Sequence, residues 1–142
     1  MFADNQNIKT FREFRYFSHI RVLGRVITHY VFVSNCTNLE EIILPDSIEK
    51  LDYQSFFNTG LREIIIPPNV KRIVGESIVR NKKLTTIIFR PIVPPEMRND
   101  SIIINEKLKK VYVPDNSLQA YKDKYANLDI SKLLCPMSEY HP

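Results

Sequence analysis

The sequence predicts a small α/β solenoid, in which coils of about 23 residues stack and each contributes one short parallel β-strand. Four segments support this architecture, because each begins with a leucine and successive leucines are 22, 23 and 24 residues apart. These leucines are Leu39, Leu61, Leu84 and Leu108. Each segment opens with Leu-x-x-(Ile/Val)-x-apolar, and three of the four place proline directly after the last apolar residue. A single coil leaves its apolar face uncovered, so the coils must stack to bury it.

Side-chain alternation defines the interior of this stack. Successive residues of a strand point to opposite faces, so Ile64 and Ile66 share one face, which we assign to the core. Pro67 then ends the strand, because proline cannot donate the next ladder hydrogen bond. A second apolar pair, Val70 and Ile73, brings the chain back along an irregular return side of short strands. The corresponding inward pairs are Ile42 and Leu44, Ile87 and Phe89, and Val111 and Val113.

Helical caps are predicted at both ends of a single domain that spans residues 1–142. Near the N-terminus, Thr10 and Glu13 have the spacing of a capping box. Three phenylalanines (Phe11, Phe14 and Phe17) follow at near-helical spacing. We therefore assign residues 1–18 to an N-terminal helical cap. Residues 19–38, which include Ile27 and Phe32, are assigned to a degenerate first coil, and residues 39–114 to the repeats.

The C-terminal cap is predicted as a helix from Ser117 to about Ala126, within residues 115–128. Asn116 is the expected N-cap residue, and Tyr121 and Tyr125 lie on one helical face that would cover the last coil. Residues 129–142 are predicted to form an irregular tail.

The repeat unit resembles a known family. The pattern Leu-x-x-Ile-x-Ile-Pro-x-x-Val-x-x-Ile, from Leu61 to Ile73, resembles the BspA-like (bacterial surface-antigen type) leucine-rich repeats. The turn from Asn35 to Leu39 is also similar to that family, as is the ending with Pro94-Pro95, Val111 to Pro114 and Ser117 to Lys122. Arg90 departs from the pattern, because proline is expected there. The resemblance covers roughly residues 10–128 and implies a leucine-rich-repeat solenoid.

The resemblance also implies a class of function. Members are commonly surface or secreted proteins of bacteria that bind host proteins, matrix or one another, and some occur in phage. The family has no shared catalytic residues. The N-terminal sequence shows no basic region followed by an apolar stretch, so no signal peptide is expected in it, and the location stays open. No apolar run approaches the length of a membrane span.

Catalytic, metal and cofactor chemistry are not predicted. The three histidines (His19, His29 and His141) have no carboxylate or cysteine at ligand spacing, and three glycines in total leave no glycine-rich phosphate loop. Cys36 and Cys135 are 99 positions apart, which is neither a metal nor a redox spacing. We expect two buried free thiols, and the alternative is a disulfide in an oxidising compartment.

The outward face of the predicted strands is the candidate partner surface. Alternation places an apolar row there with polar neighbours: Ile43, Ile65, Ile88 and Tyr112, beside Glu41, Glu63, Thr86 and Lys110. We therefore predict a non-enzymatic interaction module that binds a protein or glycan through this face. The alternative function is self-assembly, with the same row pairing chains into a homo-oligomer, a surface layer or a phage particle. The structural alternative is that β-branched residues simply suit strands and that terminal segments cover them.

A basic patch is the second candidate surface. Stacking brings together the turns that enter the third and fourth repeats, with Arg80, Lys82, Lys83, Lys107 and Lys109, next to Lys110. Such a patch suits an acidic protein or an anionic glycan, or is a solvated turn. Nucleic acid is a weaker hypothesis, because the net charge is only +4 and stacking aromatics are not interleaved with the basic residues.

Overall fold

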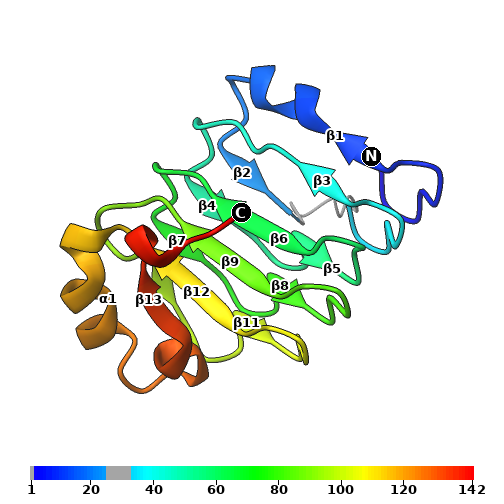
Figure 1. Cartoon of the computed structure of the whole chain (residues 1–142). Helices are drawn as coiled ribbons and strands as arrows, with labels where there is room; N and C mark the ends of the chain where they lie inside the picture. The colour runs from blue at the N-terminus through cyan, green and yellow to red at the C-terminus, as the bar shows by residue number, and fades with distance from the viewer. Residues whose placement is uncertain (1, 25–32) are drawn as a thin grey trace.

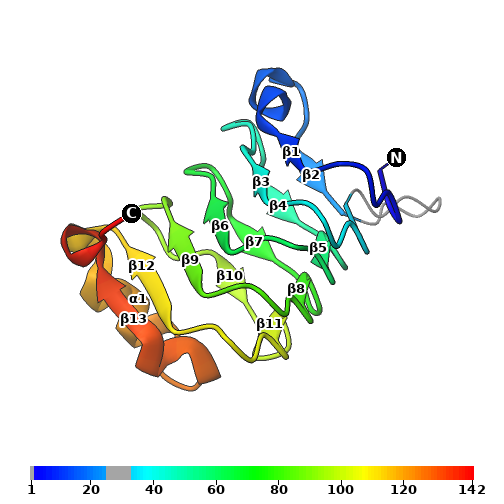
Figure 2. The same ribbon diagram turned by 45° about the vertical axis from the view of Figure 1, so that its right-hand side comes forward.

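The computed structural model describes residues 2–24 and 33–142, in which the chain winds through stacked coils (Figures 1 and 2). Every strand pairing is parallel, and most pairings join successive coils. The front sheet contains β6 (Glu63–Ile66), β9 (Thr86–Phe89), β12 (Lys110–Val113) and β13 (Leu134–Pro136), in that order. The second sheet contains β2 (Val22–Leu23), β4 (Lys50–Leu51), β7 (Arg72–Ile73) and β10 (Glu96–Met97). The third sheet contains β5 (Phe56–Phe57), β8 (Ile78–Val79) and β11 (Ile102–Ile103).

The core lies inside the coils, as the alternation predicts. Ile64 and Ile66 are buried, and they pair in register with Ile87 and Phe89 of the next coil. The return strands of the second and third sheets are only two residues long, which agrees with the predicted short-strand return side. The prediction of a parallel-strand stack is therefore confirmed.

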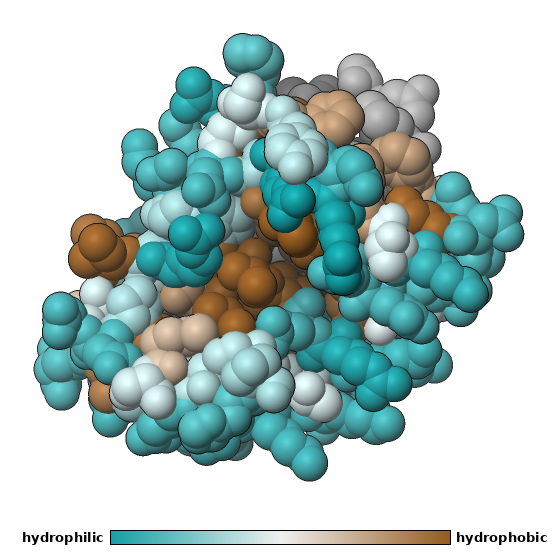
Figure 3. Space-filling view, turned by 45° about the horizontal axis from the view of Figure 1, so that its top comes forward, coloured by the Kyte–Doolittle hydropathy of each residue, from teal (hydrophilic) through white to brown (hydrophobic). Residues whose placement is uncertain are grey.

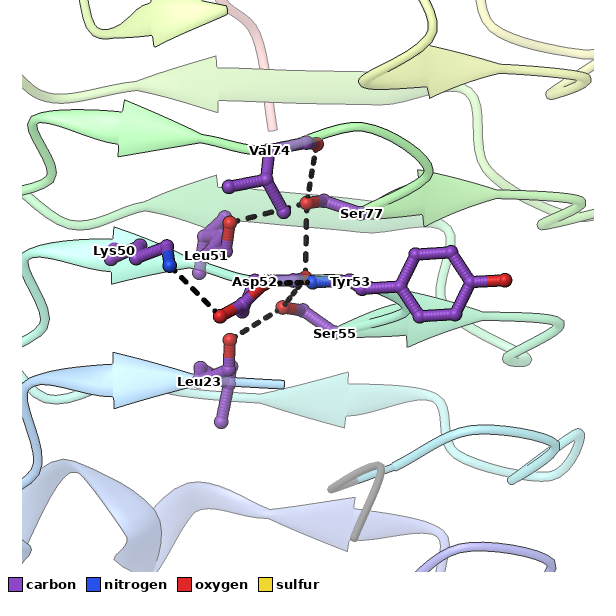
Figure 4. Close-up of polar contacts among 8 residues, drawn as sticks. All are labelled: Leu23, Lys50, Leu51, Asp52, Tyr53, Ser55, Val74 and Ser77. Carbon is purple, nitrogen blue, oxygen red and sulfur yellow. Dashed lines mark hydrogen bonds and ion pairs between the residues drawn. The ribbon is translucent and has the colours of Figure 1, made fainter. Parts of the chain in front are cut away.

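Buried serines tie the coils together at the turn between the second and third sheets (Figure 4). Ser55, Ser77 and Ser101 are fully buried, and each hydroxyl bonds a backbone carbonyl of the preceding coil. The Ser77 hydroxyl also lies 2.7 Å from the carbonyl oxygen of Val74 in its own turn. The row adds side-chain hydrogen bonds between successive coils, and two of the accepting carbonyls, those of Leu23 and Leu51, also accept a backbone amide of the next coil.

A buried asparagine performs the same task at the turn that leads to the front sheet. Asn81 Oδ1 accepts hydrogen bonds from the amide and the hydroxyl of Thr59, at 2.9 and 2.7 Å. Its Nδ2 donates to the carbonyl oxygen of Phe56 at 2.9 Å. Its own amide donates to Asn105 Oδ1 of the next coil, also at 2.9 Å. Asn81 thus fixes three consecutive turns relative to one another.

The predicted N-terminal helical cap is wrong in its capping residue and in its type of helix. Thr10 is not the N-cap of a helix. It begins β1 (Thr10–Phe11), which pairs with β3 (Glu41–Ile42) in a separate two-stranded sheet. A 3-10 helix, η1 (Arg12–Tyr16), follows β1 and buries Phe14, whose ring stacks on that of Phe11 at 5.2 Å. The physical reason is that backbone pairing with β3 satisfies more polar groups than one side-chain cap does. The degenerate first coil contributes β2, while Ile27, His29 and Phe32 lie outside the described residues.

The C-terminal helix is present but shorter than predicted. It begins at Leu118 and ends at Lys124 (α1), after the 3-10 helix η2 (Asp115–Ser117). Ser117 rather than Asn116 occupies the N-cap position, and its side chain makes no capping hydrogen bond. Tyr121 and Tyr125 are buried, and their hydroxyls donate to backbone carbonyls of Pro91 and Pro95 at 2.7 and 2.8 Å. The helix therefore covers the last coil, as expected.

The prediction of an irregular C-terminal tail is also wrong. After η3 (Asp129–Leu133), β13 adds a fourth strand to the front sheet by pairing with β12, and η4 (Met137–Glu139) follows. Ile130 and Leu134 of this segment are buried against the core. Because these apolar groups gain burial only on the finished stack, no repeat pattern in the sequence predicts the strand.

Candidate interaction site

The predicted outward row is present on three strands of the front sheet. Ile65, Ile88 and Tyr112 are register partners across β6, β9 and β12, and Cys135 of β13 continues the row. Ile43 is not a member, which corrects the predicted four-residue row. The reason is that β3 pairs with β1 instead of β6, and the Ile43 amide donates to the carbonyl oxygen of Phe11.

The front sheet is interrupted between β3 and β6. Ile42 is half-buried, whereas Ile64 at the same position of the next coil is buried. The second and third sheets continue across this interruption through the β4–β7 and β5–β8 pairings. Gly60 also holds the two coils close, because its amide donates to the carbonyl oxygen of Cys36.

The C-terminal segment crosses the outward face of the front sheet. The ring of Tyr140 contacts the ring of Tyr112 edge-on, with centroids 5.1 Å apart. The Tyr140 hydroxyl donates to Glu63 Oε2 at 2.7 Å, so the tail reaches from β12 to β6. Ile88 is consequently buried, although alternation alone places it on the open side. This covering by a terminal segment is the structural alternative that the sequence left open.

A groove remains beside the tail, with a volume of about 390 Å³. It is lined by Glu63, Ile65, Ile88, Phe89, Arg90, Pro114, Met137 and Tyr140. Ile65 is 41% exposed on its floor, and Met137 is exposed at its wall. Figure 3 shows a hollow near the middle of the face in view, with hydrophobic side chains at its bottom and hydrophilic ones around it.

Charged groups stand at the rim of the groove. The Glu63 carboxylate accepts the Tyr140 hydrogen bond, and that bond raises the pKa of Tyr140 to about 12, with burial adding to the shift. Arg90 forms an ion pair with Asp46 at 3.0 Å.

Of the other predicted site residues, Glu41 forms an ion pair with Arg12 at 2.7 Å, on the far side of the sheet interruption. Thr86 is half-buried and Lys110 is exposed, and the two are register partners.

Stacking brings the predicted basic residues together along one edge. All five are exposed: Arg80, Lys82, Lys83, Lys107 and Lys109. The Asn81–Asn105 hydrogen bonds join the two turns that carry them, and the Lys109 amide donates to the carbonyl oxygen of Thr85 at 2.9 Å. Together with Lys110 at the start of β12, these five residues form the basic edge.

The described residues contain no group of three or more histidines, cysteines, aspartates or glutamates that could hold a metal ion. Cys36 and Cys135 are both free and buried, and burial raises the pKa of each thiol. No helix of the described chain is long and apolar enough to cross a bilayer.

Sequence reasoning missed the groove wall. Pro114, Met137 and Tyr140 become site residues only because the tail folds back over the front sheet. The Tyr140–Glu63 contact joins residues 77 positions apart, and no repeat spacing predicts it. The sequence did offer a signal for Phe89 and Arg90 in the third repeat, because Arg90 stands where the other repeats have proline.

Comparison with known proteins supports the repeat assignment. A family model described as the BspA type leucine rich repeat region matches residues 4–136 in six copies. Among solved structures, the chain is similar to a leucine rich cell surface protein from Faecalibacterium prausnitzii A2-165. That similarity has 19% identity and a TM-score of 0.44, and it covers 77% of this chain and 39% of the other. No curated protein matches the sequence.

Proposed function

The chain belongs to the BspA-type leucine-rich repeat family, and on this basis we propose that it is a non-enzymatic protein-recognition module. The observation that carries the proposal is the groove on the front sheet, whose apolar floor stays open beside the C-terminal segment. A surface or secreted location is part of the same proposal and follows from the family resemblance. Protease treatment of intact producing cells checks it, because a surface protein is degraded there.

The groove has the features of a recognition site for a peptide segment. Its volume of about 390 Å³ lies within the range of typical ligand sites. Ile65 offers an exposed aliphatic side chain on a strand that is held in place by β9. An apolar contact at the centre, with Glu63 and Arg90 at the rim, matches the usual division of an interface into core and rim. We therefore expect a partner segment with an apolar side chain flanked by polar groups.

The test is a peptide selection with matched bait proteins. Ile65→Lys places a charge on the groove floor, while Val22→Lys makes the same change at a residue of similar exposure (38%) on β2. Ile88 is not a suitable target, because it is buried and its replacement by lysine would disturb folding. Peptides from a displayed random library should bind the wild-type chain and Val22→Lys but not Ile65→Lys. Recovery of no peptide that discriminates against Ile65→Lys would overturn the proposal.

Self-assembly is the second candidate function, and an exposed turn favours it. Ile92 and Val93 are 76% and 74% exposed, which is unusual for aliphatic side chains in the described part of the chain. Their turn is held rigidly, because buried Tyr121 and Tyr125 bond the carbonyl groups of Pro91 and Pro95 on either side. A fixed, exposed apolar turn of this kind can pack against an apolar surface on a second copy of the chain.

Sedimentation velocity over a range of protein concentrations tests this second candidate. Association that increases with concentration and disappears in the Ile92→Ser, Val93→Ser double variant supports it. A monomer at every concentration would eliminate self-assembly through this turn and leave the recognition function intact.

A further inference from the structure

The excess positive charge of the chain lies on the basic edge. Six basic residues occupy its two turns and the start of β12: Arg80, Lys82, Lys83, Lys107, Lys109 and Lys110. Residues 80–83 and 104–110 contain one acidic residue, Glu106. The edge therefore has a net charge of +5 (six minus one) and the whole chain +4, so the remainder of the molecule has a net charge of −1. The positive potential is therefore concentrated on one edge of the solenoid.

This charge is not compensated within the molecule. Six basic side chains elsewhere in the described residues form ion pairs with carboxylates, for example Arg12 with Glu41 and Lys50 with Asp52. None of the six basic-edge side chains forms an ion pair in that same part of the chain. All six are exposed to solvent. They are therefore available to an external anion.

The backbone beneath these cations is fixed. Lys83 and Lys107 directly precede the leading leucines of successive coils, so they occupy equivalent positions about one strand spacing apart, roughly 4.8 Å. Buried Asn81 bonds Asn105 and locks the two turns in this arrangement. The edge thus presents cations in a row that runs from coil to coil.

We propose that the basic edge is a binding site for a linear anionic glycan that carries sulfate or carboxylate groups, separate from the groove. The cations are five lysines and one arginine, and lysine interacts as a compact point charge without a fixed bidentate geometry. Such cations suit anionic groups dispersed along a flexible polymer. The bound polymer releases counterions, so its affinity depends on salt.

Other classes of partner fit the edge less well. Proteins that bind single-stranded nucleic acid add aromatic side chains that stack on bases, and residues 80–83 and 104–110 contain none. Protein interfaces favour arginine and aromatic residues and disfavour lysine. Amphipathic membrane-binding surfaces insert a face of apolar side chains beside the charges, whereas these turns expose a single aliphatic residue, Ile104.

The experiment measures binding of a heparin-derived oligosaccharide of fixed length to the full chain by calorimetry at two salt concentrations. The test variant is Lys83→Gln with Lys107→Gln, and the control is Lys71→Gln with Lys122→Gln, which removes the same charge from exposed lysines outside the edge. The test variant should bind about ten-fold more weakly at low salt, with a shallower salt dependence, while the control stays within about two-fold of the wild-type affinity.

Three results would overturn the proposal. One is an unchanged affinity in the Lys83→Gln, Lys107→Gln variant. Another is equal affinity for single-stranded DNA of matched charge, which indicates a general polyanion surface. The third is tighter binding to vesicles that contain phosphatidylglycerol than to the oligosaccharide, which indicates a membrane-docking edge.

Discussion

The Tyr140 hydroxyl donates a hydrogen bond to Glu63 Oε2 at 2.7 Å and so fastens the C-terminal segment across the front sheet. The bond is between groups that the sequence separates by 77 positions. It forms one wall of the groove and covers Ile88.

Loss of this bond should cost about 1 kcal/mol of the free energy of unfolding in the Tyr140→Phe variant at neutral pH. The pKa of Tyr140 is raised to about 12 by Glu63, above the ordinary value of 10.0. The bond therefore contributes fully below pH 10 and is lost as the pH rises towards 12. Urea unfolding of both proteins checks this: the difference should be constant below pH 10 and vanish near pH 12. A difference that grows with pH would contradict the assignment.

Ile104 is held in a left-handed backbone conformation with φ of 56°, although it is β-branched and 53% exposed. Asn35 and Asn58 occupy the corresponding turn position in earlier coils, also with positive φ. Because asparagine tolerates this conformation far better, Ile104→Asn should stabilise the protein by about 1 kcal/mol, seen as a higher urea midpoint. Ile92→Asn, at an exposed aliphatic residue without positive φ, should leave the midpoint nearly unchanged.

Asn81 supports three turns and is fully buried, so Asn81→Ala should destabilise the chain by about 3 kcal/mol. The reason is that the Thr59 amide and the Phe56 carbonyl lose their partner in the interior. Asn69→Ala removes one hydrogen bond, to the carbonyl oxygen of Asp46, from an exposed residue and should cost less than about 1 kcal/mol. Equal losses in the two variants, measured by urea unfolding, would refute the role given to Asn81.

Gly60 and Gly75 should respond differently to replacement by alanine. A Cβ on Gly60 would lie 2.3 Å from the carbonyl oxygen of Thr37, a backbone atom of the preceding coil. Gly60→Ala should therefore cost about 3 kcal/mol or prevent folding. A Cβ on Gly75 would meet the side chain of Asp100, which can move away, so Gly75→Ala should cost about 1 kcal/mol or less. Thermal denaturation followed by circular dichroism compares the two, and a more stable Gly60→Ala would show that these coils do not approach closely.

The sequence predicted those features that depend on the local repeat. The inward positions of Ile64 and Ile66 follow from alternation within one strand, and the structure agrees. Thr10 shows why the N-terminal prediction failed: its capping-box spacing is equally compatible with an extended strand once β3 offers a pairing edge. The prediction wrongly placed Ile43 in the outward row. The pairing partner of β3 depends on which coil lies beside it, and nothing within the repeat itself determines that partner.

The sequence contains the three serines at regular spacing, but the prediction did not identify them as one buried row. Ser55, Ser77 and Ser101 recur 22 and 24 residues apart, a spacing that matches the leucine repeat and predicts a shared structural position. Tyr140 offered no such pattern, because its contact with Glu63 exists only after β13 has joined the sheet.

The missing pairing between β3 and β6 divides the solenoid into an N-terminal block and a C-terminal block, and the strands of the C-terminal block are more extensively paired. The block that begins at β6 has an unbroken ladder through β13. The block with β1 and β3 is joined to it through β4, β5, the Gly60 turn and the buried hydrogen bonds of Ser77 and Asn81. A pulling force along the stack should consequently separate the coils between β3 and β6 first. The N-terminal block would then detach while the groove keeps its shape.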